Sequence, residues 1–396
     1  MPWAALLTMA LTTFIVVSGE MMPAAVLPAL AADLRVSLSS AGLLVSAWAA
    51  VVVVATFPLA RLTARLARPV VIGWALTVFA IATLVTAFAP TYAIAMGSRL
   101  LAAGATGLLW ATVNGHAAAI VAPQRIARAA AVVLFGGMLG TVAAIPAASA
   151  LAGLFGWRVP FAGLGVLALA GAAAVARVLR QPGAGDVEPS RRPGAGNGRA
   201  GTTRGTGPSM VRALVLVATL GALVMAGHFT AFTFVAELLL PSAVPAAVLL
   251  LVFGLAGAAG VALVGLTSDR YPGVVPALVA LTMAAGLIAL PGLGRGPVFD
   301  LAVMVGWGAV AGAVGPALQA ALMRMAGAGH RRTAGSLMPV AMNLGIAVGA
   351  AAGSGVIDRW SLGLLPPLAA APALIAAAGF VVVGWRASRP RVMVCA

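Results

Sequence analysis

The sequence predicts an all-α membrane protein with twelve transmembrane helices in two six-helix halves. Of the 396 residues, 62% are hydrophobic and only 8% are charged, whereas soluble domains carry about 25% charged residues. The apolar stretches run for about 20 residues, the length with which a helix crosses the hydrocarbon layer of a bilayer. They lack the alternation of polar and apolar residues that marks the strands of a membrane β-barrel, so a barrel is excluded.

Twelve apolar spans follow one another along the chain. Helices this apolar show no useful periodicity, so their ends are the least defined part of the prediction. We expect the helices over residues 5–28, 40–60, 70–88, 93–116, 129–152, 159–179, 211–235, 245–266, 274–292, 299–322, 334–356 and 364–385. The fourth either ends near His116 or continues beyond it. Glycine-rich runs at 306–315 and 345–355 are typical of close helix packing in lipid.

The first span resembles a secretory signal peptide only in the small residues Ala29-Leu30-Ala31. No Lys or Arg precedes it, it is longer than a signal-peptide core, and it contains Glu20. We therefore expect a transmembrane helix.

The distribution of arginine predicts the orientation of the chain. All 24 basic residues are Arg. With the N-terminus inside, the inner segments hold 19 of them and the outer loops hold four, while Arg99 lies within a span. This excess predicts a multi-pass protein of the plasma (inner) membrane with both termini in the cytoplasm. It also argues against a nucleic-acid-binding stripe, despite the net charge of +16.

One long polar interruption divides the chain. Residues 181–210 are rich in Gly, Pro, Ser, Thr and Arg, cannot bury a core, and are predicted to be a flexible cytoplasmic linker. They separate an N-terminal half (1–180) from a C-terminal half (211–390), which a cytoplasmic tail (391–396) follows. Two halves of six spans suggest a duplication with a binding site between them near the membrane midplane. The short basic turns at 60–69 and 265–272, six spans apart, form a weak repeat.

Composition also excludes several kinds of chemistry. Without lysine the chain has neither a Walker A phosphate loop nor a Schiff-base residue. The single cysteine, Cys395, cannot form an intramolecular disulfide or a cysteine metal cluster. His116, His228 and His330 are far apart in the sequence and show no catalytic or metal-ligand spacing. We expect no cofactor, no metal and no enzymatic activity; a polytopic membrane enzyme is a remote alternative.

Several motifs carry a family resemblance. They are the segment from Gly19 to Ala49 with Glu20 eight residues before Pro28, the segment from Ser98 to Ala111 around Arg99, Phe155-Gly156-Trp157-Arg158, Gly265-x-x-x-Asp269-Arg270, and Asn343-Leu344-Gly345. Together they resemble the major facilitator superfamily, in particular its twelve-helix drug:proton antiporter branch. The chain is similar to chloramphenicol-resistance, arabinose-efflux and purine-ribonucleoside-efflux exporters, and Trp110 is similar to a residue of the sugar and nucleoside exporters.

The chain departs from the family pattern in two motifs. In the first-half cytoplasmic loop, Ala60 and Ala64 replace the Gly and Asp of the motif, while Arg65 and Arg68 remain. In the fifth helix Pro146 is present, but alanines replace its flanking glycines. The resemblance implies that Gly265, Asp269 and Arg270 form a cytoplasmic gate. The alternative for Asp269 is a simple turn with a helix cap.

Glu20 is the strongest candidate for function. A carboxylate within a span is costly when ionised and unpaired, so it should be protonated or paired, and such groups are functional by default. The alternative is a structural carboxylate bonded to a neighbouring helix. Arg99 is the natural partner, because both residues lie about 10 Å from the outer ends of their predicted helices, and the resemblance places these helices side by side. The alternative for Arg99 is snorkelling to the outer interface.

The remaining candidates are isolated polar or soft side chains. His228 and Glu237 lie nine residues apart in the seventh predicted span and should point in nearly the same direction, with Glu237 near the interface. Interhelical hydrogen bonding explains the intramembrane polar groups as well as ligand contact does. These groups are Asn114, His116, Gln319 and Asn343, of which the two asparagines are preferred for function. Trp110, Met21 and Met22 could contact an apolar ligand, although packing roles are more common.

The sequence therefore predicts a proton-coupled secondary transporter. We expect it to export a small hydrophobic or amphiphilic compound of the drug or antibiotic type by alternating access. The alternative cargo is a sugar, a nucleoside or an amino acid, and a receptor that does not transport is a further reading of the same fold. The expected partners are the small molecule, protons and lipid, and we expect a monomer.

Overall fold

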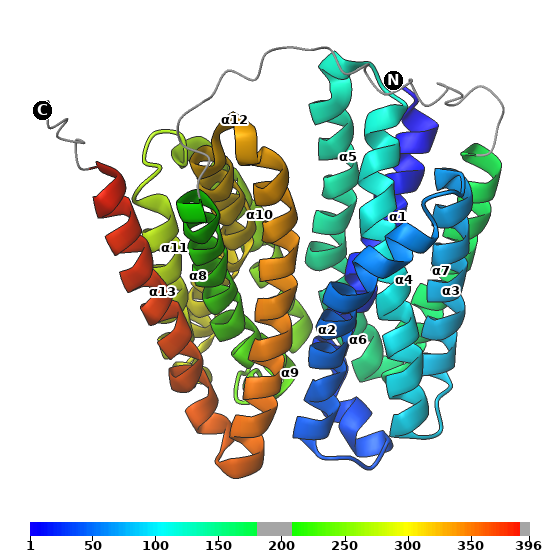
Figure 1. Cartoon of the computed structure of the whole chain (residues 1–396). Coiled ribbons are helices and arrows are strands. Elements are labelled where there is room, and N and C mark those ends of the chain that lie inside the picture. Colours follow the sequence, from blue (N-terminus) through cyan, green and yellow to red (C-terminus); the bar gives the residue numbers. More distant parts are fainter. Residues whose placement is uncertain (180–207, 389–396) are drawn as a thin grey trace, which may run out of the picture.

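The computed structural model describes residues 1–179 and 208–388, which form two bundles of helices (Figure 1). The predicted linker, apart from residues 208–210, and the predicted tail lie outside the described residues. The first bundle contains α1 (Trp3–Asp33), α2 (Leu38–Leu62), α3 (Arg68–Ala87), α4 (Tyr92–Ala119), α5 (Ile126–Leu139), the π-helical turn η2 (Gly140–Ala144), α6 (Ile145–Phe155) and α7 (Arg158–Val178). The second contains α8 (Pro208–Phe232), α9 (Val235–Leu238), α10 (Ala246–Thr267), α11 (Val275–Ala289), α12 (Pro297–Arg359) and α13 (Leu365–Ser388).

The predicted fold class is confirmed. The described part of the chain has twelve helical segments long and apolar enough to cross a membrane, and each coincides with a predicted span. α5, η2 and α6 together form one of them, and α12 contains two, Pro297–Ala326 and Leu337–Arg359. α4 continues past His116 to Ala119, and α1 continues five residues beyond the predicted end, to Asp33. The chain is a multi-pass membrane protein.

Glycines allow the helices of the second bundle to approach closely. A side-chain carbon at Gly345 would lie 2.6 Å from the carbonyl oxygen of Ala222 in α8, and one at Gly353 would lie 2.6 Å from that of Thr230. Any larger residue would push α12 away from α8, along which it packs. The glycine-rich run at 345–355 is thus a packing surface, as its composition suggested.

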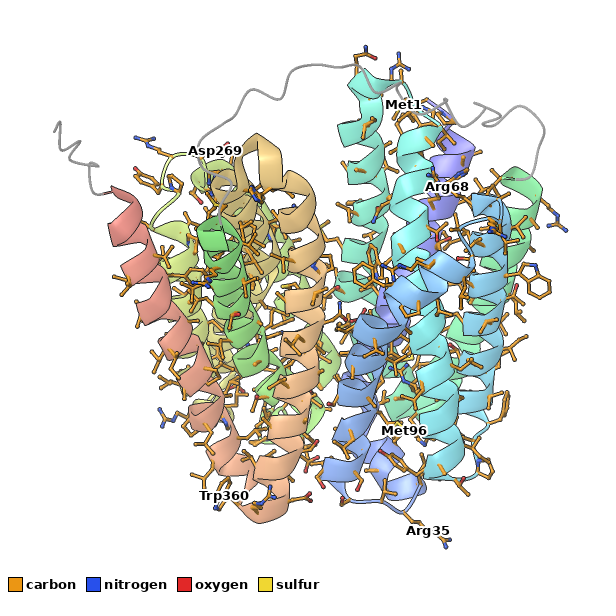
Figure 2. All side chains as sticks on the ribbon, viewed as in Figure 1. Met1, Arg35, Arg68, Met96, Asp269 and Trp360 are labelled. Atoms are coloured by element: carbon orange, nitrogen blue, oxygen red, sulfur yellow. The ribbon has the colours of Figure 1, made fainter. Side chains whose placement is uncertain are left out.

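Both ends of the described chain lie at the same face of the molecule (Figure 1). Figure 2 shows Met1, Arg68 and Asp269 at this face, which we call the N-terminal face, and Arg35, Met96 and Trp360 at the opposite face. The short turn after α2 and the turn after α10 are therefore on the same side. This is the arrangement expected for two halves of six spans each.

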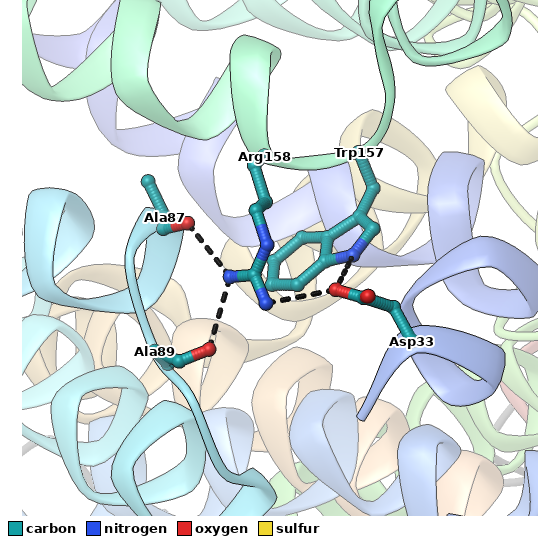
Figure 3. A network of polar contacts seen from close by, with 5 residues as sticks. All are labelled: Asp33, Ala87, Ala89, Trp157 and Arg158. Carbon is teal, nitrogen blue, oxygen red and sulfur yellow. Dashed lines mark hydrogen bonds and ion pairs between the residues drawn. The ribbon is translucent and has the colours of Figure 1, made fainter. Parts of the chain in front are cut away.

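A polar network fixes the opposite face of the first bundle (Figure 3). Arg158 pairs with Asp33 at 2.8 Å, and the indole Nε1 of Trp157 donates to the same carboxylate at 2.9 Å. Arg158 also donates to the carbonyl oxygens of Ala87 and Ala89, both at 2.9 Å. The Trp157-Arg158 motif therefore ties the end of α1 to the α3–α4 turn and to the start of α7.

The two bundles are joined toward the opposite face. Ser39, at the start of α2, donates a hydrogen bond to the carboxylate of Asp358 near the end of α12. Two turns further along α2, Ser46 donates to the carbonyl oxygen of Ala347 at 2.7 Å. α2 packs along α12 between these contacts. The halves are thus held together on the side away from both chain ends.

Candidate functional site

The carbonyl group of Gly19 is the starting point of the site. Pro23 lies four residues later in α1 and has no N–H, so it cannot donate the helical hydrogen bond that this carbonyl would otherwise accept. Arg99 of α4 takes that place, and its Nη1 donates to the Gly19 oxygen at 2.7 Å. The spacing of Gly19 and Pro23 in the sequence predicts a backbone carbonyl without its helical donor. It does not predict which side chain donates to that carbonyl instead.

Arg99 lies inside the first bundle and not at the membrane interface. Its side chain is only 2% exposed, and its Cζ atom lies 3.9 Å from the ring centroid of Trp48 in α2. The ring of Phe161 in α7 is more distant, at 6.0 Å. The Nε and Nη2 atoms of Arg99 are buried and have no hydrogen-bond partner. A buried donor without a partner costs about 1–3 kcal/mol, so this arrangement requires an explanation.

Glu20 follows Gly19 directly and is half-buried. Because α1 extends to Asp33, Glu20 lies nearer the middle of its helix than expected, about 20 Å from the end. Arg99 is bonded to the backbone of the residue that precedes Glu20. Among the described residues, however, the ion pairs shorter than 4.0 Å are Arg158–Asp33 and Arg324–Asp269. The structure thus brings the two predicted partners together without closing the ion pair.

Two other candidates of the first bundle lie further along α4. Trp110 is half-buried and packs near Gly137 of α5, and Asn114 is exposed. They lie about 16 Å and 22 Å along the helix from Arg99, toward the N-terminal face. His116 is 7% exposed. None of the three is brought into contact with Arg99. In α1, Met22 is buried and Met21 is half-buried.

His228 is the candidate of the second bundle that lies deepest. It is 5% exposed, and its ring centroid lies 5.0–6.2 Å from those of four aromatic residues. Its Nδ1 atom has no hydrogen-bond partner. The surrounding rings come from α8, α10 and α12: Phe229, Phe232, Phe253 and Trp307.

The prediction that His228 and Glu237 share one helix is wrong. α8 ends at Phe232, and Glu237 belongs to the separate short helix α9 after a two-residue turn. Their nine-residue spacing therefore does not set a common direction. The apolar run continues through this turn, so composition alone carried no sign of the break.

Asn343 and Gln319 are half-buried residues of α12. The Asn343 amide donates to the carbonyl oxygen of Pro339 at 3.1 Å, one turn earlier, while its Oδ1 atom is buried without a partner. Neither residue contacts Glu20 or Arg99 through a hydrogen bond. Pro146 lies at the start of α6, directly after the π-helical turn. That turn lies against Gly254 of α10, where a side-chain carbon would come within 2.8 Å of Val142.

The gate candidates lie in equivalent turns of the two bundles. Asp269, in the turn after α10, pairs with Arg324 of α12 at 3.2 Å. Arg68, which follows the turn after α2 as the first residue of α3, donates to the Gly115 carbonyl oxygen of α4 at 2.9 Å. The turn region after the second membrane-spanning segment of each half is thus bonded to the fourth segment of the same half. The two basic turns that form the weak sequence repeat therefore make equivalent contacts in the structure.

The other gate candidates have few contacts. Arg270 lies over the ring of Tyr271, with Cζ 5.6 Å from the ring centroid. Arg65 is exposed. A side-chain carbon at Gly265 would meet no atom within 4 Å. Among the described residues, no three His, Cys, Asp or Glu side chains are placed to hold a metal ion.

Comparison with known proteins agrees with this architecture. The family model described as Major Facilitator Superfamily matches residues 9–350. A chloramphenicol efflux pump of Mycobacterium tuberculosis is 32% identical over 366 residues, which cover 89% of this chain and 85% of that protein. The chloramphenicol resistance protein of Streptomyces lividans is 32% identical, with 93% of each chain covered. The inner membrane transport protein YdhP of Escherichia coli is also 32% identical, with 89% and 88% covered.

Solved structures share the fold at lower identity. A crystal structure of the peptide transporter POT has a TM-score of 0.78 at 15% identity and covers 96% of this chain and 94% of its own. The inward-facing, unoccupied structure of a bacterial homologue of the human lysosomal transporter Spinster has a TM-score of 0.69 at 16% identity, with 96% and 95% covered. These two likenesses concern the fold alone.

Proposed function

The chain belongs to the major facilitator superfamily, and on that premise we propose that it exports a small hydrophobic or amphiphilic compound in exchange for protons. The observation that carries the proposal is the arrangement of Glu20, Gly19 and Arg99. It places one carboxylate and one guanidinium inside the first bundle, near each other and without an ion pair in this conformation.

Proton coupling requires a group that binds and releases a proton as the conformation changes. Within a membrane an ionised carboxylate needs a nearby cation, so contact between Arg99 and Glu20 favours proton release. In the present conformation Arg99 is bonded to the Gly19 carbonyl, and Glu20 is left to hold its proton. A change in the relative position of α1 and α4 exchanges one partner for the other. This exchange is the coupling step of the proposed cycle.

The orientation of the molecule is part of the proposal. We place the N-terminal face in the cytoplasm of the cell, because the arginine excess lies in the segments at that face. The bonds from Ser39 to Asp358 and from Ser46 to Ala347 then close the outer side. We infer that this conformation is the inward-facing state of alternating access, in which cargo enters from the cytoplasm.

The cargo class rests on two observations. The curated relatives at 32% identity include a chloramphenicol efflux pump and a chloramphenicol resistance protein. The half-buried residues Trp110 and Met21 offer soft and aromatic surface. Such surface suits an amphiphilic compound better than a sugar, which needs many hydrogen bonds. A sugar, nucleoside or amino acid exporter is the second candidate.

Transport by the purified protein tests the proposal. Proteoliposomes are given an inward or outward pH difference, and the accumulation of an amphiphilic amphenicol, a pentose and a nucleoside is measured together with proton movement. We expect accumulation of the amphenicol on the acidic side, with protons moving the opposite way. Accumulation of only the pentose or the nucleoside would support the second candidate. If accumulation of the cargo does not depend on the direction of the pH difference, the proposed exchange for protons is contradicted.

A further inference from the structure

The unpartnered edge of Arg99 has a defined geometry. A guanidinium is planar, and its five N–H groups point outward in that plane. Nη1 is used by the Gly19 carbonyl, while Nε and Nη2 are buried and make no hydrogen bond. Nε and Nη2 lie on the same edge and form the fork that donates to both oxygens of a carboxylate. The structure therefore presents a free carboxylate fork inside the bundle.

The plane of that fork is set by Trp48. The guanidinium carbon lies 3.9 Å from the centroid of the indole ring, within the range of a cation–π contact. Trp48 is itself fixed, because it is 1% exposed and meets the ring of Phe79 edge-on at 6.3 Å and 87°. Its Nε1 atom makes no hydrogen bond. The contact with Arg99 thus depends on the face of the ring and not on the indole N–H.

Glu20 is the carboxylate that fits the fork. Asp33, the other acidic residue of α1, is paired with Arg158 at the opposite face. In the described part of the first bundle, the remaining titratable or charged residues lie at the ends of helices or in turns: Arg35, Arg61, Arg65, Arg68, Tyr92, His116, Arg125, Arg128, Arg158 and Arg177. In the second bundle, α9 and α12 pack against α1 and α2 and carry Glu237, Asp300, Arg324, His330, Asp358 and Arg359.

We propose that Trp48 is a positioning residue, which holds the guanidinium plane so that the Nε–Nη2 edge of Arg99 receives the Glu20 carboxylate when the proton leaves. This inference rests on the proposed function, in which Glu20 carries the proton. Trp48 touches neither cargo nor proton. It acts on Arg99, and it determines how strongly Arg99 and Glu20 pair when they meet.

A purely space-filling role for Trp48 makes a different prediction. If only volume matters, any apolar side chain of similar size should serve, and a smaller aromatic ring should not. If the ring face matters, phenylalanine should keep the function and leucine should lose it. Leu44 provides the matched control, because it lies one turn earlier on the same face of α2 and is fully buried. Truncating it removes packing without removing a ring.

The test compares the pH dependence of transport for Trp48→Phe, Trp48→Leu and Leu44→Ala in proteoliposomes. We expect Trp48→Leu to raise the pH of half-maximal transport by about one unit, as a cation–π contact in a dry site is lost. Trp48→Phe and Leu44→Ala should stay close to wild type in this midpoint, whatever their effect on the amount of folded protein. If Trp48→Leu is not recovered folded, Trp48→Met places a longer, flexible apolar side chain there without a ring and answers the same question.

The possible outcomes separate this inference from the proposed function. An unchanged midpoint in Trp48→Leu or Trp48→Met, or an equal shift in Leu44→Ala, overturns the positioning role. Neither result contradicts the proposed role of Glu20, provided that Glu20→Gln still abolishes pH-driven transport. If Glu20→Gln transports uphill as wild type does, the proposed function fails first. A midpoint shift in Trp48→Leu with rescue in Trp48→Phe supports the inference.

Discussion

At the scale of single residues, one missing backbone N–H determines which group Arg99 is bonded to. Pro23 removes the helical donor of Gly19, and Arg99 supplies another from a different helix. The guanidinium is therefore anchored next to Glu20 but bonded to the backbone. Hydrogen bonds from charged groups contribute about 1.5–3 kcal/mol, so the carbonyl is a real competitor for the carboxylate. The sequence predicts Glu20 and Arg99 as partners, because charged groups within apolar spans are rare. It missed the carbonyl and Trp48, because neither is unusual by residue type.

The Gly19 carbonyl and the Glu20 carboxylate compete for the Arg99 guanidinium, and replacing Pro23 with alanine should favour pairing with Glu20. The new N–H at position 23 can donate to Gly19 within the helix, which frees Arg99 for the carboxylate. We expect the pH of half-maximal transport to fall by about one unit, opposite in sign to the effect of Trp48→Leu.

Pro28→Ala is the matched control for this prediction. It also removes a proline from α1, but the carbonyl it affects belongs to Ala24 and accepts no bond from Arg99. The pH profile of each variant is measured in the same vesicles. Equal midpoints for Pro23→Ala and Pro28→Ala would mean that helix regularity, and not the Gly19 carbonyl, controls the profile.

At the scale of elements, the twelve spans could be predicted because hydropathy and length suffice for a transmembrane helix. The ends were less predictable. α1 runs five residues further than expected, because its last turn is tied down by the Asp33–Arg158–Trp157 network that the sequence pattern did not predict. The break between α8 and α9 occurs within an uninterrupted apolar run, so the common direction inferred for His228 and Glu237 failed. The ends and breaks of these helices depend on tertiary contacts, which amino-acid composition does not reveal.

The turn after α10 should control the rate of cycling. Asp269 pairs with Arg324 at an exposed surface, where an ion pair contributes little to folding. We therefore expect Asp269→Asn to lower the turnover number severalfold, with cargo affinity and thermal stability nearly unchanged. Turnover is measured by transport and affinity by equilibrium binding. The exchanged pair Asp269→Arg with Arg324→Asp should recover turnover. Weaker cargo binding at an unchanged turnover would place Asp269 at the cargo and not at a gate.

At the scale of the whole molecule, two halves are closed on one side. The contacts between α2 and α12 lie toward the opposite face, and the π-helical turn of the first half lies against Gly254 of the second. A sequence of two similar halves predicts that they meet, but not which side is closed. That choice depends on Ser39, Ser46 and Asp358, which are ordinary residues in the sequence. Their role in joining α2 to α12 is evident only from the arrangement of the two bundles in the structure.

Ser39→Ala should shift the balance of states toward opening of the opposite face. The variant loses a hydrogen bond to a charged group, so the ratio of open to closed molecules should rise about tenfold. Spin labels at positions 35 and 360 report the distance across this face. Ser361→Ala, which changes an exposed serine nearby, is the control. An unchanged distance distribution in Ser39→Ala would show that this contact does not hold the face closed.

The central claim is that Glu20 carries the coupled proton, and Glu20→Gln tests it most directly. Glutamine keeps the shape of the protonated carboxyl group and cannot release a proton. Vesicles containing wild type or the variant are given the same pH difference, and two rates are measured: uphill accumulation of cargo, and exchange of labelled for unlabelled cargo at equal pH. We predict that the variant loses accumulation and keeps exchange. Accumulation by Glu20→Gln at the wild-type level would contradict the account and place the coupled proton on another residue.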